Sequence, residues 1–342
     1  MLRRQFCKAL LTAPAALAAP ALRRSALAQE PTRITLMMQH GLPYLPLMVM
    51  EANKLVEAHA AKLGLPALKA QYAQLGGTSS LVDALLAGSV NFAVTGVPGL
   101  ATLWAKTAGT PQEVQALCAV QSMPFYLVTN NAAVKSLSDF TDKDKIALPS
   151  VKVSSQAVCL QMAAAQQWGM DKFDKLDAIT ITRPHPDATA SVITGSTEVN
   201  SHYSAAPFYY YELAAAGVHS VLKSYDTLGG HSTNGVMLMS KTFGEANPKI
   251  RAAVFGALQD ANALINTQPR QAAEIYIAAT KEKRAGPDEM AKMIADADNV
   301  WTPTPQNAMK FIEFMHKTGS IKKLPASWKD VFMAETHGLP GT

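Results

Sequence analysis

The chain has few cysteines and few aromatic residues. Only 3 of its 342 residues are Cys, and Phe, Trp and Tyr together make up 7%. So few Cys cannot form the disulfide framework of a small secreted scaffold, and a chain of this length does not need one to bury a core. Sparse aromatics offer no extended platform on which nucleic-acid bases would stack. Both classes of protein are therefore excluded.

An excess of charge of one sign is also missing from most of the chain. The formal net charge is +5, but five of the 31 basic residues lie in residues 1–28, which contain no acid. The remaining 314 residues carry 26 bases and 26 acids. A formally neutral body has no positive field that would attract phosphate backbones, so we expect no nucleic-acid partner.

The N-terminus has the pattern of an export signal. A basic start at residues 1–8 precedes an apolar run of 14 residues at 9–22, shorter than the roughly 20 residues that span a bilayer. Ala26 and Ala28 are the small residues that precede a cleavage site, so residues 1–28 are predicted to be removed. Arg3 and Arg4 resemble the twin-arginine export motif, with the general secretory route as the alternative. No later window reaches 18 uncharged apolar residues, which predicts a soluble, periplasmic mature protein.

Two cysteines remain after residue 28. Cys118 lies in a strand-like pattern and Cys159 in a helical one. One bridge between them is possible in an oxidising compartment. We expect two separate buried thiols, because free Cys is among the most buried residue types.

Strand and helix patterns alternate along the mature chain. Strands are predicted at residues 33–38, 68–75, 90–95, 114–120, 125–129, 145–148, 178–182, 198–203, 218–223 and 236–240. Helices are predicted at 45–63, 79–87, with Thr78 or Ser79 as its cap, 100–106, 154–168, 187–193 and 208–215. Four more, each starting at Pro, are predicted at 248–266, 269–280, 287–297 and 305–318. This order predicts an α/β fold of two units followed by a helical tail.

Familiar catalytic motifs are missing. The sequence has no G-x-S-x-G elbow, no phosphate-binding or dinucleotide-binding glycine motif, no C-x-x-C and no H-E-x-x-H. Its eight His residues are scattered. We therefore predict no enzyme activity, no catalytic residue, no metal site and no cofactor.

Polar loops follow several predicted strands, where ligands bind in open α/β sheets. Two of these loops, Thr78 to Ser80 and Ser154 to Gln156, each open a helix, whose free backbone N–H groups suit an anionic or polar group. The alternative is that these residues only cap their helices. Thr233 and Asn234, where the chain enters the last strand, are equally consistent with a hinge and with ligand contact.

Residues 76–98, GGTSSLVDALLAGSVNFAVTGVP, carry a family resemblance. This stretch resembles the nitrate, sulfonate and taurine solute-binding proteins of ABC importers, which share a superfamily with the thiamine-pyrimidine precursor binders. The resemblance implies a type II periplasmic binding protein fold, in which two α/β domains with a hinge enclose a central ligand cleft. By position, residues 29–123 plus 225–342 would form domain one, and residues 124–224 an inserted domain two.

The resemblance also implies the ligand-binding residues. Transferred by position, they are Gln39, His40, Gly77, Thr78, Ser79, Ser80, Thr95, Gly96, Ser154, Ser155, Gln156, His202, Tyr203 and Phe208. The acid of the family's aromatic-acid-proline segment is absent from residues 202–208, and none of these loops contains Arg. Tyr203 and Phe208, with Phe125 nearby, suit a ligand with an apolar body.

These features predict a solute-binding protein that captures a small organic molecule and delivers it to a membrane permease of an ABC importer. The ligand would be a sulfonate, a carboxylate or an aromatic or heterocyclic compound. An enzyme on the same scaffold, related to thiamine-pyrimidine synthesis, is one alternative, although the cysteine cluster of those enzymes is absent. A ligand-sensing partner of a membrane receptor is another. We expect a monomer, because no heptad repeat or long apolar patch indicates an interface.

Overall fold

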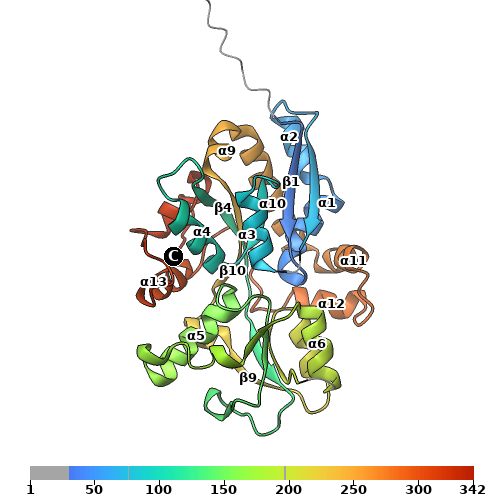
Figure 1. The fold of residues 1–342 in the computed structure, drawn as a ribbon. Coiled ribbons are helices and arrows are strands. Elements are labelled where there is room, and N and C mark those ends of the chain that lie inside the picture. Colours follow the sequence, from blue (N-terminus) through green and yellow to red (C-terminus); the bar gives the residue numbers. More distant parts are fainter. Residues whose placement is uncertain (1–30, 76, 196–197) are drawn as a thin grey trace, which may run out of the picture. The chain divides into compact units, whose positions relative to one another are not determined.

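The computed structural model describes residues 31–75, 77–195 and 198–342. The predicted export signal, residues 1–28, lies outside the described residues. Within them, the chain forms two five-stranded sheets with helices around them (Figure 1). None of the described helices combines the length and apolar character that a bilayer crossing requires.

The first sheet has the strand order β2-β1-β3-β10-β4. Its strands are β1 (Arg33–Met38), β2 (Lys69–Gln74), β3 (Phe92–Thr95), β4 (Val114–Ser122) and β10 (Thr233–Ser240). β1 pairs in parallel with β2 and β3, whereas β10 is antiparallel to β3 and β4. The first sheet is therefore completed by a strand that lies more than a hundred residues later in the sequence.

The second sheet has the strand order β7-β6-β8-β5-β9, and its strands all lie between β4 and β10 in the sequence. They are β5 (Tyr126–Thr129), β6 (Ile146–Leu148), β7 (Thr180–Thr182), β8 (Ser201–Ser204) and β9 (His219–Lys223). β6 is parallel to β7 and β8, and β5 is antiparallel to β8 and β9. The predicted domain boundaries at 123/124 and 224/225 stay a prediction.

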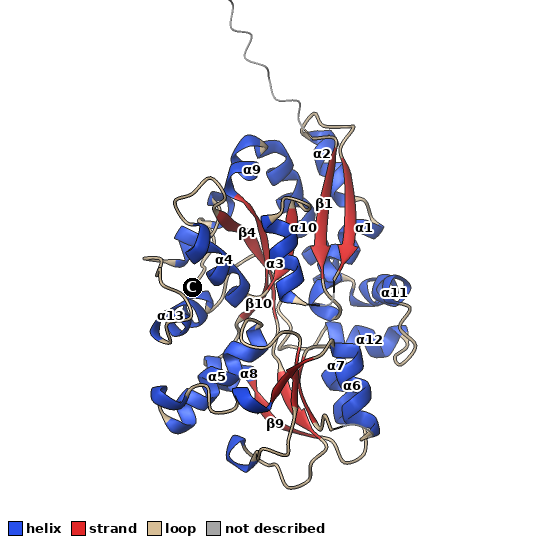
Figure 2. Cartoon of the chain, viewed as in Figure 1, coloured by secondary structure: helices blue, strands red, loops and turns tan. Residues whose placement is uncertain are grey.

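Helices surround both sheets (Figure 2). They are α1 (Leu45–Ala52), α2 (Leu55–Lys62), α3 (Thr78–Leu86), α4 (Val97–Thr107), α5 (Ser155–Trp168), α6 (His185–Thr194), α7 (Phe208–Ala214), α8 (Ser224–Leu228), α9 (Lys241–Ala246), α10 (Pro248–Thr267), α11 (Pro269–Thr280), α12 (Pro287–Ile294) and α13 (Ala308–Lys317). Successive residues of a strand point to opposite faces of its sheet. Met237 and Met239 of β10 accordingly pack in a core cluster with α1, α2 and α10, whereas Val236 and Leu238 pack in another with α3, α4 and α13.

Three helix predictions are corrected by the structure, and two short helices were missed. The helix expected at 45–63 is broken at Lys54, whose left-handed φ of 50° ends one helix and begins the next. The last helix begins at Ala308 and not at Pro305, because Asn307 also has positive φ. Gly77 occupies the cap position of α3, so neither Thr78 nor Ser79 caps that helix. The short helices α8 and α9 were not predicted.

The two remaining thiols are separate, as expected. Cys118 in β4 and Cys159 in α5 are both free and both buried. Burial raises the pKa of the Cys159 thiol to about 12, so this thiol stays protonated near neutral pH. The alternative of a bridge between them is therefore wrong.

Candidate functional site

A polar pocket lies between the two sheets, and both sheets contribute to its wall. Its volume is about 30 Å³, which is room for about two water molecules. The residues that line it are Gln39, His40, Pro43, Tyr44, Thr78, Gly96, Phe125, Pro149, Ser155, Gln156, His185, Ala205 and Asn234. None of them is Lys, Arg, Asp or Glu, so the wall carries no formal charge when its two imidazoles are neutral.

The first-sheet wall consists of residues at or next to the ends of β1, β3 and β10. Gln39 follows β1, and its Nε2 atom donates a long hydrogen bond of 3.5 Å to Thr78 Oγ1 at the start of α3. His40 follows Gln39, and burial lowers the pKa of its imidazole, an effect that the Asp187 carboxylate partly opposes. Asn234 in β10 has a buried Nδ2 atom without a hydrogen-bond partner. This wall therefore presents one amide donor that nothing in the described chain satisfies.

The second-sheet wall begins at the N-terminus of α5. Ser154 caps this helix, because its Oγ accepts a hydrogen bond from Ala157 N at 3.2 Å and donates one to Ser150 O at 2.7 Å. The capping alternative is therefore confirmed for Ser154. The hydroxyl of Ser155, the next residue, is buried and has no partner. An unsatisfied buried hydroxyl is costly, so a group that satisfies it would be bound with a gain in free energy.

A buried chain of hydrogen bonds supports this second wall. Gln156 Nε2 lies 3.2 Å from His185 Nε2, His185 Nδ1 lies 2.7 Å from His202 Nε2, and His202 Nδ1 lies 2.6 Å from Glu212 Oε1. Burial, together with the neighbouring His202 and His40, lowers the pKa of His185 well below its usual value. His185 is therefore neutral where it meets the pocket.

Two glycines of the first wall allow the second wall to approach closely. A Cβ on Gly96 would overlap the Ser155 hydroxyl, and a Cβ on Gly77 would lie 3.1 Å from Ser150 Oγ. The walls also share a direct hydrogen bond, in which Leu42 N donates to Ala206 O at 2.8 Å. The absence of a side chain at Gly77 and Gly96 therefore allows the two walls to lie this close together.

The predicted site residues divide into three groups. Six line the pocket: Gln39, His40, Thr78, Gly96, Ser155 and Gln156. Gly77, Ser79 and Ser80 instead line an adjacent, more open hollow of about 320 Å³ together with Pro149, Ser150, Val151 and Thr182. The other five lie behind the wall: Thr95, Ser154, His202, Tyr203 and Phe208.

The residues behind the wall support those in front. Phe208 stacks on the His185 ring with centroids 5.4 Å apart, and His202 holds the other side of the same imidazole. Tyr203 donates its hydroxyl to Cys159 Sγ at 3.2 Å, inside the core of the second sheet. Thr95 Oγ1 is buried without a partner beside Gly99.

Sequence reasoning did not select seven lining residues: Pro43, Tyr44, Phe125, Pro149, His185, Ala205 and Asn234. Phe125 and Asn234 carried a signal, since both lie next to points where the chain passes between the sheets. His185 carried none, because it opens α6 two residues before the predicted start of that helix. Only the tertiary structure brings it to the pocket.

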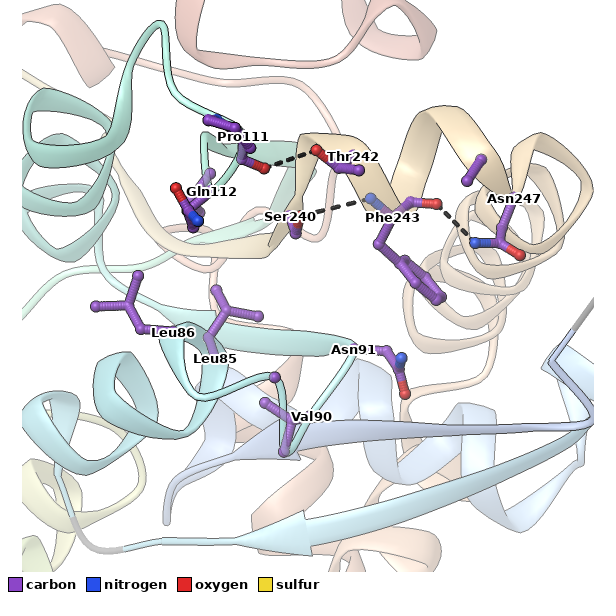
Figure 3. A pocket seen from close by; sticks show the side chains of 13 residues that line it. Leu85, Leu86, Val90, Asn91, Pro111, Gln112, Ser240, Thr242, Phe243 and Asn247 are labelled. Atoms are coloured by element: carbon purple, nitrogen blue, oxygen red, sulfur yellow. Dashed lines mark hydrogen bonds between the residues drawn. The ribbon is translucent and has the colours of Figure 1, made fainter. Parts of the chain in front are cut away.

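A larger hollow of about 460 Å³ lies near the other end of the first sheet (Figure 3). Leu85, Leu86 and Val90 form much of its apolar wall. Two of its polar side chains have partners: Thr242 Oγ1 donates to Pro111 O at 2.7 Å, and Asn247 Nδ2 donates to Phe243 O at 2.8 Å. None of the described residues that line this hollow has a buried side-chain N or O atom without a partner, in contrast to the pocket between the sheets.

No cluster of three or more His, Cys, Asp or Glu side chains suited to a metal ion is found within residues 31–75, 77–195 and 198–342.

Comparison with known proteins identifies the fold. No protein-family model and no curated protein matches the sequence. Among solved structures, the chain is similar to the alkanesulfonate-binding protein SsuA from Xanthomonas axonopodis pv. citri bound to MOPS, with a TM-score of 0.68, 17% identity and coverage of 86% of this chain and 96% of that one. It is similar to the periplasmic nitrate-binding protein NrtA from Synechocystis PCC 6803, with a TM-score of 0.66, 15% identity and coverage of 89% and 87%.

A Candida albicans protein described as having the generic periplasmic binding protein fold is also similar, with a TM-score of 0.62, 13% identity and coverage of 88% of this chain and 96% of that one. The predicted fold class is confirmed: the chain has the α/β periplasmic binding protein fold, with two five-stranded sheets.

Proposed function

We propose that this protein is the exported solute-binding protein of an ABC importer. It captures one small organic molecule in the pocket between the two sheets and hands it to a permease in the inner membrane. Binding and release require no chemical step, so the protein works without a cofactor. The general role is supported by the fold, which it shares with binding proteins for sulfonates and nitrate.

The observation that carries the proposal is the set of unsatisfied polar groups in the pocket. Ser155 Oγ comes from the second sheet's side and Asn234 Nδ2 from the first, and both are buried without a partner. Buried polar atoms are almost always hydrogen-bonded in folded proteins, so such atoms at one cavity favour a missing ligand. A ligand that contacts both walls also favours their approach over their separation.

The chemistry of the wall favours a ligand with one polar group and an apolar body. No side chain on the wall carries a fixed charge, so a bidentate guanidinium clamp on an anion is absent from the described lining. The amide, hydroxyl and imidazole groups suit a weakly charged or neutral head. Phe125 and Tyr44 supply apolar surface. These features support a sulfonate, a carboxylate or an aromatic or heterocyclic compound.

The cavity is smaller than any such molecule, so the two walls must lie further apart both when the ligand enters and when it is held. We place the moving parts at the predicted boundaries, with residues 29–123 plus 225–342 as domain one and residues 124–224 as domain two. The two connections between the sheets, after β4 and before β10, would act as the hinge. The proposal includes export to the periplasm through residues 1–28 and action as a monomer.

The direct test is a thermal-shift screen followed by calorimetry on the mature chain, using alkanesulfonates, aromatic acids and pyrimidines. A ligand that binds only the folded state raises the Tm in proportion to the logarithm of its concentration. Gln156→Leu should abolish the shift, because Gln156 lines the pocket. Gln167→Leu on the same helix is the matched control, because Gln167 is exposed and bonds Ser138 Oγ.

A second measurement tests delivery. The liganded protein should bind its cognate permease in proteoliposomes and stimulate ATP hydrolysis there. Capture by a receptor ectodomain without any effect on a permease would replace transport with signalling. If no compound in the screen shifts the wild type, or if both Gln variants respond alike, the pocket is not the binding site.

A further inference from the structure

Four side chains form one continuous line from the core of the second sheet to the pocket. Glu212 in α7 contacts His202 in β8, His202 contacts His185 in α6, and His185 contacts Gln156 in α5. The side chains of His202 and Glu212 are both 0% exposed. In a buried row of hydrogen bonds, each ring nitrogen either donates or accepts. The donor and acceptor roles along the four side chains are therefore linked, and fixing them at one end fixes them at the other.

The charge of the buried end sets these donor and acceptor roles. The Glu212 carboxyl contacts His202 through Oε1, and its Oε2 atom is buried without a partner among the described residues. The guanidinium of Arg284 lies over the Tyr211 ring at 4.4 Å and is paired with Glu282 at 3.1 Å. A lone carboxylate at this place would be an uncompensated buried charge, which is expensive. One proton shared between Glu212 and His202 Nδ1 removes that cost.

Both neutral arrangements of this pair give the same result at His185. Either Glu212 is ionised and His202 is an imidazolium, or Glu212 is protonated and donates to the Nδ1 atom of a neutral His202. In each case His202 carries a proton on Nε2, and it donates this proton across the 2.7 Å contact to His185 Nδ1. His185 therefore accepts at Nδ1 and carries its own proton on Nε2, toward the pocket.

We propose that Glu212 and His202 are positioning residues that hold His185 as a neutral Nε2–H donor to Gln156, so that Gln156 in turn offers its N–H groups to a ligand that brings acceptors. The lowered pKa of His185 agrees with the neutral form. The other titratable group that acts on this imidazole is His40, which lines the same pocket and is itself influenced by Asp187, two residues after His185 in α6.

Gln156 transmits the direction to the ligand. Gln156 Nε2 is the atom placed 3.2 Å from His185 Nε2, and two N–H groups do not bond each other. Because the two ends of a carboxamide have the same shape, a half turn of the Gln156 amide places Oε1 where it accepts the proton of His185 Nε2. The Gln156 N–H groups are then left for an acceptor, and Asn234, whose Nδ2 has no partner, lines the same pocket. The ligand class that fits is one with oxygen acceptors, such as a carboxylate or sulfonate. This ligand assignment rests on the proposed function, whereas the tautomer assignment does not.

The experiment is long-range 1H–15N NMR on the ligand-free mature protein with 15N-labelled His. Protonated and unprotonated ring nitrogens have widely separated 15N shifts, so each tautomer is read directly. We expect His185 to be neutral, with a protonated Nε2 and an unprotonated Nδ1, and His202 to be protonated on Nε2. A His185 ring protonated on Nδ1 would overturn the proposal.

Two variants of Glu212 separate positioning from folding. Glu212→Gln keeps the size of the side chain but not its shared proton, and either end of its amide can meet His202 Nδ1, so His185 should lose its single tautomer while the fold is retained. Glu212→Ala should give averaged 15N shifts at His185, since nothing then fixes the direction. Unchanged 15N shifts of His185 in Glu212→Ala would show that Glu212 does not fix the His185 tautomer. If that variant does not fold, the wild-type and Glu212→Gln spectra decide.

A His–carboxylate pair elsewhere in the chain supplies the matched control. His59 Nε2 lies 2.7 Å from Asp260 Oδ2 on α10, in a more exposed place. Asp260→Ala should change the His59 signals and leave His185 as it was. A shift at His185 in this control would show that its tautomer reports on general stability and would overturn the assignment.

The ligand assignment is tested separately with two small probes. Methanesulfonate, which offers only acceptors, should perturb the Nε2 signal of His185 and the side-chain amide signal of Gln156 at millimolar concentration. Methylammonium, which offers only donors, should not. The opposite pattern would overturn the ligand class while leaving the tautomer result intact, and no response to either probe, with the expected tautomer, would count against both the pocket and the acceptor assignment.

Discussion

The two walls of the pocket are built differently. The first-sheet wall includes Gln39, Thr78 and Gly96 at element ends, and the hydrogen bond between Gln39 Nε2 and Thr78 Oγ1 is a long one of 3.5 Å. The second-sheet wall has Gln156 and His185 in front of a fully buried line of short hydrogen bonds. Preorganised groups lose less entropy when a ligand binds. The difference indicates that the second wall fixes the chemistry of recognition and that the first wall completes it on approach.

The largest expected effect comes from separating the walls. Gly96→Ala places a methyl group on the Ser155 hydroxyl, and overpacking of this kind costs about 1 to 3 kcal/mol. Because ligand binding depends on the approach of the walls, affinity should fall by about 10- to 100-fold. Calorimetry with the ligand found in the screen measures the effect.

The control for this substitution is Gly286→Ala. Gly286 also caps a helix with extended backbone, and a Cβ there would contact nothing within 4 Å. It should leave affinity unchanged. Ser155→Gly in the Gly96→Ala background should restore part of the affinity, and an equal loss in both alanine variants would show that the walls do not need to approach.

The second prediction concerns the second-sheet wall, and it is read from the pH dependence of stability. His185 stays neutral in the folded state, whereas in the unfolded chain its imidazole takes up a proton below about pH 6.5. The unfolded state then binds more protons, so the free energy of unfolding should fall as pH falls from about 6.5. The slope for one such group is about 1.4 kcal/mol per pH unit.

Urea unfolding of the wild type and His185→Gln at pH 7.5, 6.0 and 5.0 measures this slope. Below about pH 6.5, the free energy of unfolding of His185→Gln should fall less steeply with falling pH than that of the wild type, by about 1.4 kcal/mol per pH unit. Equal slopes in the two proteins would mean that His185 titrates in the folded state as it does in the unfolded one, and the second wall would not be preorganised.

The third prediction uses the unpartnered hydroxyl where the walls meet. Ser155→Ala removes a buried group that has no partner without ligand, so the Tm of the ligand-free protein should be unchanged or higher. Affinity should fall by about 2- to 10-fold, since one neutral hydrogen bond contributes about 0.5 to 1.5 kcal/mol. A lower Tm with full affinity would assign Ser155 a structural role. Differential scanning calorimetry with and without ligand distinguishes the two.

The smallest effect is expected behind the wall. Tyr203→Phe deletes the hydroxyl that donates to Cys159 Sγ, which should cost about 1 kcal/mol of stability. Affinity for ligand should not change, because Tyr203 does not line the pocket. A clear loss of affinity at unchanged stability would show that Tyr203 does contribute to ligand binding, as the sequence predicted.

The sequence predicted regular elements well where a single physical signal dominates. The strand expected at residues 33–38 is β1 without change, because its apolar run is bounded by polar residues. Helices that start at Pro248, Pro269 and Pro287 were placed correctly, since Pro fits the first helical turn. The break at Lys54 was missed because left-handed backbone at a Lys leaves no trace in composition.

The site was predicted in part for the same reason. Loops that follow strands are visible in the sequence, and they gave Gln39, Thr78 and Gly96. His185 and Glu212 lie on helices, and only folding brings them into one line with His202. Long-range pairing of buried polar groups has no period and no fixed spacing, so a single sequence does not reveal it.

The most direct test of a ligand between the walls is native mass spectrometry of the protein purified from its own periplasm, before and after denaturation. The wild type should carry one small molecule that denaturation releases, and Gly96→Ala expressed in the same way should carry markedly less. The same molecule retained equally by both proteins, or no molecule in either after a broad metabolite screen, would contradict the account.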